Sequence, residues 1–177
     1  MQSAFKKLKY KKMETQKHHN LILAKLALIH EKISNFSAQK LGPIVFNFGT
    51  KEKAWNLTTE NLLQFPEGSL GKTLGEFLKT NRLEPIAGAE SHDVYHLLFN
   101  YSTSFKDEVG LQFFLRGNGK NSLASFATAI GAWCILPTQW NYLRASYKRG
   151  KKCNDVSKLN LKALLNEDFD KIKLSIN

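Results

Sequence analysis

The chain has 177 residues, of which 42% are hydrophobic and 23% are charged. This length and apolar content suffice for one sizeable hydrophobic core, and the composition excludes an intrinsically disordered chain. The 2 cysteines give neither a disulfide framework nor a CxxC metal pair. The formal net charge of +11 favours an anionic partner, either nucleic acid or an anionic membrane surface.

Two clusters of basic residues carry much of this charge. No zinc-finger spacing or RNP-type aromatic motif accompanies them, so we rank a membrane surface above nucleic acid. No apolar run is long enough to cross a bilayer, and we expect a cytoplasmic protein, peripheral to the inner membrane. The clusters are Lys6, Lys7, Lys9, Lys11, Lys12 and Lys17 near the N-terminus, and Arg144, Lys148, Arg149, Lys151 and Lys152 after the last long apolar segment.

The first half of the chain predicts helices separated by loops. Asn20 is placed to cap an amphipathic helix from Leu21 to about Phe36. The segment Ile44–Phe48 is either a short extended link or a helical turn. Thr58–Leu63 predicts a short helix, and Ser69–Asn81 predicts a longer one with four apolar residues on one face.

The second half continues the helical pattern. Gly117–Gly119 predicts a turn, and the apolar run Leu123–Pro137 predicts a buried helix. An aromatic and basic helix follows over Thr138–Lys148, and Gly150 is expected to close it. The last two predicted elements are Asn160–Leu165 and Glu167–Ile172. We therefore predict an all-α protein of about seven helices, with residues 1–19 as a basic segment and 20–177 as a single helical domain.

Four side chains that bind metals, His92, Asp93, His96 and Glu108, fall within 17 residues. His92 and His96 are four apart, which places both imidazoles on one face of a helix, one turn apart. Asp93 lies roughly 100° round that helix, where it can join the site or orient a ligand. On an unbroken helix Glu108 would point roughly 160° away from His92.

The intervening residues predict that the helix does break. Asn100–Ser104 has the composition of a turn, and Ser104 with Asp107 resembles a capping box for a second helix from about Phe105. Two helices joined by a short loop pack antiparallel, which would bring Glu108 to face the histidines. Two imidazoles with one or two carboxylates suit Zn(II), Fe(II), Mn(II) or Co(II).

Other interpretations of the same residues stay open. A histidine pair at this spacing also occurs on helix surfaces without a metal. A metallophosphohydrolase of the HD type would use His30, the pair His92-Asp93 and Asp155, and would leave Glu108 without a role. A third interpretation is a lipid-binding scaffold in which the metal is structural. The sequence assigns no catalytic residue.

The spacing of the four residues resembles the signature of the Coq-four family of ubiquinone (coenzyme Q) biosynthesis proteins. Three further segments are similar to the family's Pro-Glu-Gly-Thr-Leu-Gly segment, its Tyr/Trp-x-x-Gly segment and its terminal acidic-aromatic helix. The resemblance covers roughly Leu62 to Ile176. The segments are Phe65–Gly71 with the helix end Asn81-Arg82, Tyr147–Gly150, and Glu167–Phe169.

This resemblance implies an all-α fold in which the His-Asp-His-Glu cluster binds a divalent metal beside a long apolar cavity for a polyprenyl chain. It implies a role in decarboxylation and hydroxylation at C1 of a prenylated hydroxybenzoate, or in organising the biosynthetic complex. The expected partners are a polyprenyl lipid or quinone precursor, a membrane surface, other quinone-biosynthesis proteins and a second copy of the chain. Candidate tail-channel residues, each also explained as ordinary core, are Leu70, Leu74, Phe77, Phe113, Phe114, Phe126 and Trp133.

Overall fold

The computed structural model divides the chain into two compact units, Met1–Lys40 and Leu41–Asn177. The described residues are Glu14, 16–18, Asn20, Leu21, Lys25, 52–120 and 139–176. Most of the helix predicted over 21–36, the segment 44–48, and the apolar run 123–137 with Phe126 and Trp133 lie outside them. The predicted boundary between residues 19 and 20 stays a prediction.

The predicted cap at Asn20 is wrong. Asn20 is itself helical, as are Glu14 and residues 16–18 before it. Its side-chain oxygen accepts a hydrogen bond from Gln16, four residues earlier, at 3.4 Å. Four-residue spacing joins neighbours on one helix face, so here the Asn20 side chain serves a helix interior and not a helix start.

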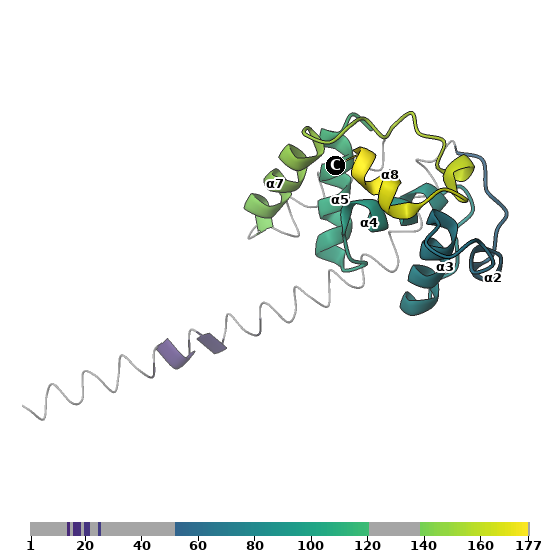
Figure 1. Cartoon of the computed structure of the whole chain (residues 1–177). Helices are drawn as coiled ribbons and strands as arrows, with labels where there is room; N and C mark the ends of the chain where they lie inside the picture. The colour runs from purple at the N-terminus through teal and green to yellow at the C-terminus, as the bar shows by residue number, and fades with distance from the viewer. Residues whose placement is uncertain are drawn as a thin grey trace, which may run out of the picture. The chain divides into compact units, whose positions relative to one another are not determined.

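The described part of the second unit is all-α, as predicted, with six α-helices and one 3-10 helix (Figure 1). It contains no strand, only an isolated bridge between Ser69 and Asp168. None of the helices found in the described ranges has the length and apolar character needed to span a membrane. The elements are α2 (Thr59–Leu62), α3 (Leu70–Asn81), α4 (Glu90–Phe99), α5 (Phe105–Gly117), α7 (Trp140–Gly150), η2 (Leu161–Leu164) and α8 (Phe169–Ile176).

Local capping sets where these helices begin and end. Thr58 and Asn61 form a reciprocal capping box at α2, and the Ser69 side chain accepts the N–H of Lys72 at α3. At the end of α4, Asn100 adopts the left-handed conformation, with φ of 53°. Asparagine tolerates that conformation better than most residues, so the predicted break after α4 is confirmed.

Three polar residues hold the break between α4 and α5. Ser104 caps α5 by accepting the N–H of Asp107, as predicted. The Asp107 carboxylate does not return to the Ser104 N–H, as a capping box would require. It accepts the N–H and the hydroxyl of Ser102 at 3.0 and 2.7 Å. The Asp107 side chain therefore closes the turn on Ser102, two residues before Ser104, the partner that the sequence predicted.

The core is formed by leucines and aromatic rings from α3, α4 and α5 with the C-terminal segment. The rings of Phe99 and Phe114 lie 4.1 Å apart between their centroids at its centre. Among the predicted channel residues, Leu70, Leu74 and Phe114 are fully buried in this core. They are core side chains in this structure. Phe77 is only partly buried at its edge, and Phe113 is partly buried against a second, smaller cluster formed by Val109 and Leu143.

The C-terminal segment covers the N-terminus of α3. The N–H groups of Leu70 and Gly71 donate to the carbonyls of Glu167 and Leu165, at 2.9 and 2.8 Å. These are two of the N–H groups that a helix leaves without an internal partner. The two sequence segments that resembled one family, far apart in the chain, therefore contact each other here.

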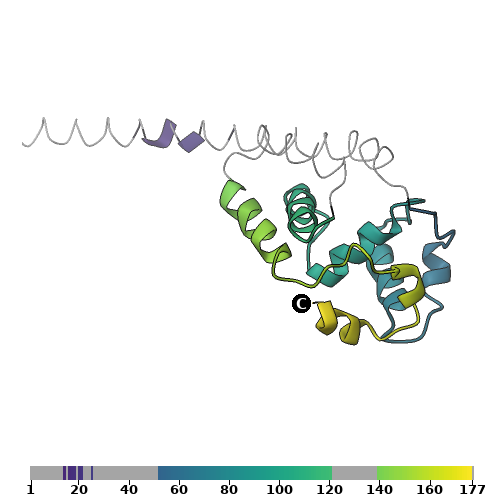
Figure 2. The ribbon, with the colours of Figure 1, turned by 90° about the horizontal axis from the view of Figure 1, so that it is seen from above.

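Helix α7 lies alongside α5, as both views show (Figures 1 and 2). A Cβ at Gly150 would collide with the carbonyl oxygen of Phe114, and one at Gly117 with that of Tyr147. Between them the buried Asn118 amide donates to the carbonyls of Gly150, Cys153 and Asn154, and its oxygen accepts the Val156 N–H at 2.9 Å. Gly150 is the last residue of α7 and permits close packing, whereas the sequence predicted it only as a helix stop.

We expect Gly150→Ala to lower the free energy of unfolding by about 1–3 kcal/mol, because the added methyl meets backbone that cannot move aside. In a helix without this contact the same change would stabilise by roughly 0.5–1 kcal/mol. Denaturant titration measures the difference, with Arg144→Ala, an exposed position on the same helix, as control. A stabilised Gly150→Ala protein would contradict the packing described.

Candidate metal centre

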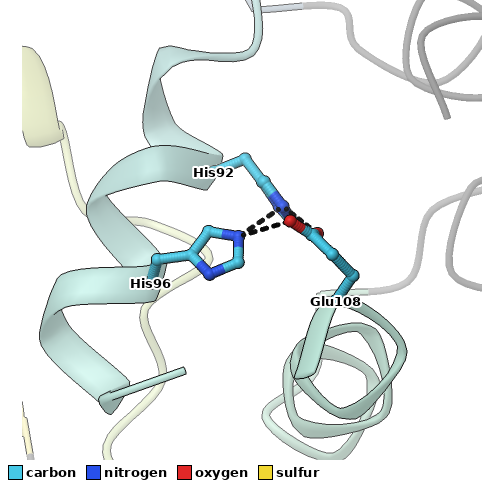
Figure 3. A group of neighbouring side chains, drawn as sticks. All are labelled: His92, His96 and Glu108. Carbon is cyan, nitrogen blue, oxygen red and sulfur yellow. Dashed lines mark hydrogen bonds and ion pairs between the residues drawn. The ribbon is translucent and has the colours of Figure 1, made fainter. Parts of the chain in front are cut away.

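Helix α4 presents both histidines to one place. His92 and His96 lie one turn apart, and their rings point from α4 towards the start of α5 (Figure 3). Their ring centroids are 4.7 Å apart. His96 is 2% exposed, whereas the His92 side chain is 13% exposed. Solvent therefore reaches the histidine pair on the side of His92.

Glu108 reaches the pair from the first turn of α5. Ser104 starts α5 four residues earlier, which places Glu108 at the end of α5 nearest to α4. The two helices were predicted to pack antiparallel, and this is wrong, because their axes cross: α5 is seen end-on where α4 is seen from the side (Figure 3). A crossing still brings Glu108 opposite the histidines, because only the first turn of α5 has to approach α4.

Three ligand atoms converge between these helices. The Nε2 atoms of His92 and His96 are 3.0 Å apart. The Glu108 carboxylate lies 3.0 Å from the first and 3.2 Å from the second, through different oxygens. Ligands about 2.0–2.1 Å from a tetrahedral zinc ion are separated by about 3.3 Å. The residues present thus fit one divalent ion, and they form the group of three that the described part of the chain offers for a metal.

The orientation of His96 is fixed from behind. Its Nδ1 lies 3.1 Å from the carbonyl oxygen of Tyr101, which only accepts hydrogen bonds. Nδ1 therefore carries the proton, and in the neutral ring the Nε2 lone pair points at His92 and Glu108. A backbone carbonyl that fixes the tautomer in this way is typical of metal-binding histidines.

The charges of the three side chains depend on one another. Burial would raise the pKa of the Glu108 carboxyl, but hydrogen bonds and charge interactions with His92 and His96 outweigh burial and lower the pKa to about 2. Burial lowers the pKa of His92 despite its bond to Glu108. Burial opposes the proton on His96 as well, but Glu108 and the Tyr101 carbonyl together raise its pKa. Glu108 is thus an ionised carboxylate at neutral pH.

Asp93, the fourth predicted residue, is not a member of the group of three. Burial raises the pKa of its carboxyl to about 7, and the charges of Glu108 and Glu90 add to this while His96 opposes it. Asp93 is therefore close enough to interact electrostatically with the site. Its role as fourth ligand or as a residue that orients a ligand stays a prediction.

Sequence reasoning missed Glu90, and it named Phe77 only as a channel candidate, whereas both residues help to position the site. The buried Glu90 carboxylate accepts the N–H groups of Trp55 and Gly88 at 2.7 and 2.8 Å, which ties the segment before α2 to the start of α4. Phe77 of α3 stacks on the His96 ring with centroids 6.1 Å apart. Glu90 lies two residues before His92, but nothing in the local sequence indicates its distant partner Trp55.

The phosphohydrolase interpretation finds no support in this arrangement. Its Asp155 is exposed and accepts the N–H of Ser157 at 2.8 Å, outside the group of His92, His96 and Glu108. Its His30 lies outside the described residues. Glu108, which that interpretation leaves without a role, bonds both histidines of the group.

The fold and the site together define an all-α protein with a two-histidine, one-glutamate constellation on crossed helices. No model of a known protein family matches the sequence, and no curated protein matches it. Among solved structures, the chain is similar to a Nostoc punctiforme protein described as a "putative ubiquinone biosynthesis protein". The TM-score is 0.52 at 17% identity, over 82% of this chain and 79% of that one. The chain has the fold of that protein, and the resemblance predicted from the sequence is confirmed at that level.

We expect Glu108→Gln to abolish stoichiometric metal binding, because an amide offers a neutral oxygen where the ion needs a carboxylate. Asp93→Asn should keep the ion, with affinity reduced about 10–100-fold at most, as for a residue that orients a ligand. Metal analysis after dialysis, followed by chelator competition, measures both. Glu76→Gln, an exposed carboxylate of α3, is the control. Complete metal loss in Asp93→Asn would instead make Asp93 a ligand.

Proposed function

We propose that this protein binds a divalent metal and a polyprenyl lipid at a membrane surface, and acts in the synthesis of ubiquinone or a related quinone. The reaction that we propose is decarboxylation or hydroxylation at C1 of a prenylated hydroxybenzoate. The observation that carries the proposal is the convergence of His92, His96 and Glu108 in a fold shared with the Nostoc protein.

The donor set suits this chemistry. A divalent ion held by two imidazoles and one carboxylate keeps open positions and acts as a Lewis acid towards a carboxylate or phenolate oxygen. The chain's own residues set the direction of approach. His96 is closed off behind Phe77 and the Tyr101 carbonyl, whereas His92 and Glu108 keep 13% and 30% of their side chains exposed. Substrate would therefore enter from the His92 and Glu108 side.

The lipid tail needs an apolar surface in the neighbourhood of the metal group. Phe77 supports the proposal, because it is partly buried, packs on the core and already touches the site through His96. Phe113 is also partly buried and meets the exposed Trp140 edge-to-face, with centroids 5.9 Å apart. These rings are the described candidates for contact with a prenyl chain.

The basic cluster on α7 supports attachment to an anionic membrane, with one change from the predicted set. Lys148, Lys151 and Lys152 are exposed. Arg149 donates to the carbonyl of Phe99 at 2.8 Å and lies over the Tyr101 and Phe114 rings, so its guanidinium stabilises the fold. Arg144 is exposed as well, so the proposed headgroup contacts are Arg144 and the three lysines.

An enzyme and a lipid-binding scaffold of a quinone-biosynthesis complex both need this site. They differ in whether metal-loaded protein changes a prenylated hydroxybenzoate. We propose the enzyme, because a purely structural ion is normally enclosed by four protein ligands, whereas three protein ligands are typical of catalytic zinc.

Native mass spectrometry of the full chain should show one divalent ion and a co-purified prenyl lipid. In His96→Ala both the ion and the metal-dependent conversion of 3-geranyl-4-hydroxybenzoate should be lost, because one ligand and the core-facing wall of the site are removed. His18→Ala, an exposed histidine far upstream in the chain, is the matched control. Equal metal content in wild type and His96→Ala would rule out the proposed site. A metal-loaded protein that binds the acid without converting it would support the scaffold.

For the membrane, replacing Lys148, Lys151 and Lys152 by glutamine should reduce retention on vesicles that contain anionic lipid. Each lysine near such a surface contributes about 1 kcal/mol. The control replaces three exposed lysines elsewhere, Lys79, Lys158 and Lys171, to keep the change in net charge equal. Co-sedimentation at low salt measures retention. Equal losses in both triple variants would show a general charge effect and no binding face on α7.

A further inference from the structure

A second cluster of polar side chains lies beside the candidate metal group. Lys120, which follows the end of α5, donates from Nζ to a Glu52 carboxylate oxygen at 2.9 Å and to the Tyr95 hydroxyl at 3.1 Å. Its ammonium also lies 4.6 Å from the centroid of the Tyr95 ring. These partners are 68 and 25 residues away in the sequence, so the fold alone assembles the cluster.

The cluster adjoins the metal group through α4. Tyr95 stands between His92 and His96 in the sequence of that helix, so the residue that Lys120 hydrogen-bonds directly precedes a ligand of the metal group. The electrostatics agree with this placement. Burial is the main cause that lowers the pKa of His92, and the positive charge of Lys120 lowers it further. Lys120 therefore lies within electrostatic range of the first ligand.

Two hydrogen-bond donors of this cluster have no acceptor among the described residues, one on the half-buried Lys120 and one on the buried Tyr95. A lysine ammonium has three N–H groups, and among the described residues Glu52 and Tyr95 take two of those of Lys120. The Tyr95 oxygen accepts from Lys120, which leaves its own O–H as a donor. The Lys120 side chain keeps 28% of its surface exposed, so a ligand at the metal can approach it.

The two donors select the class of ligand. A hydrogen bond from an ammonium to a carboxylate is charge-assisted and roughly twice as strong as one between neutral groups. A carboxylate can accept the Lys120 N–H and the Tyr95 O–H through its two oxygens at once. A neutral phenol or alcohol accepts a weaker bond and brings no negative charge to the ammonium.

We propose that Lys120 and Tyr95 form an anchor for the carboxylate of an aromatic acid bound at the metal, and so select acids over their neutral analogues. This inference rests on the proposed function. It assigns residues to the carboxylate end of the substrate, which the metal group alone would not distinguish from other oxygen ligands. Glu52 holds the ammonium in place and at the same time limits its attraction for the ligand.

The competing explanation is a structural clamp, in which Lys120 and Glu52 only tie the segment before α2 to the end of α5. The two explanations differ in what Glu52→Gln does. An anchor becomes more attractive to an acid when its neighbouring carboxylate is neutralised, whereas a clamp is weakened by loss of either partner. Lys120→Arg keeps the charge and serves as the rescue variant.

The experiment titrates zinc-loaded, full-length protein with 3-geranyl-4-hydroxybenzoate and with 3-geranyl-4-hydroxybenzyl alcohol, and measures metal content and thermal stability alongside. We expect Lys120→Met to weaken binding of the acid about tenfold or more, the size of one charge-assisted hydrogen bond, and to leave the alcohol within about twofold. Tyr95→Phe should act in the same direction by a smaller factor. Glu52→Gln should bind the acid more tightly than wild type. Lys171→Met, an exposed lysine on α8, is the control.

Equal weakening of acid and alcohol in Lys120→Met, or weaker binding of the acid in Glu52→Gln, overturns the anchor and leaves the proposed function intact. Preserved metal content in Lys120→Met separates this outcome from a damaged metal site. A wild-type protein that takes up zinc but binds neither compound overturns the anchor and the proposed substrate together.

Discussion

The contact of the Glu108 carboxylate with both imidazoles, across two crossed helices, is the interaction on which the rest of the site depends. It joins α4 to α5 at one point, through one carboxylate that uses a different oxygen for each histidine. Without an ion the imidazoles can hold the half-buried Glu108 carboxylate only through Nε2–H groups, and these contacts keep it ionised. An ion would take the place of those protons, and the two Nε2 lone pairs and the carboxylate would then share one centre. The site is therefore arranged before it binds a metal, which lowers the ordering cost of binding.

Such a contact requires backbone that is held elsewhere, and buried polar groups supply much of that support. Glu90 fixes the start of α4, the Tyr101 carbonyl fixes the His96 ring, and Asn118 joins the end of α5 to the residues after α7. Each is a satisfied buried group, and Glu90 and Asn118 have partners far away in the sequence. Loss of a single partner would leave a buried donor or acceptor unpaired, which costs more than the bond itself contributes. A change that weakens one of these supporting hydrogen bonds is thus expected to destabilise the fold and the metal site together.

The two sides of the site differ in polarity, and this difference gives it a direction. Phe77 and the core close the side of His96, whereas Glu52 and Lys120 meet the buried Tyr95 of α4 in a polar cluster. An amphiphilic acid matches this division, because its carboxylate needs donors and charge while its hydrocarbon needs apolar surface. The metal group by itself would accept many oxygen ligands. The neighbouring polar cluster is what makes one class of ligand preferable.

The sequence by itself determined the parts of this protein that depend on local chemistry. The spacing of His92 and His96, the turn at Asn100 and the cap at Ser104 follow from periodicity and side-chain hydrogen bonds, so the helices, the break and three members of the metal group were predictable. Four other features could not be predicted from the sequence. They are the crossing of α4 and α5, the packing contact at Gly150, the hydrogen bond from Arg149 to the Phe99 carbonyl, and the ion pair of Lys120 with Glu52. Each depends on groups that are distant in the chain, and only tertiary packing decides which of them meet.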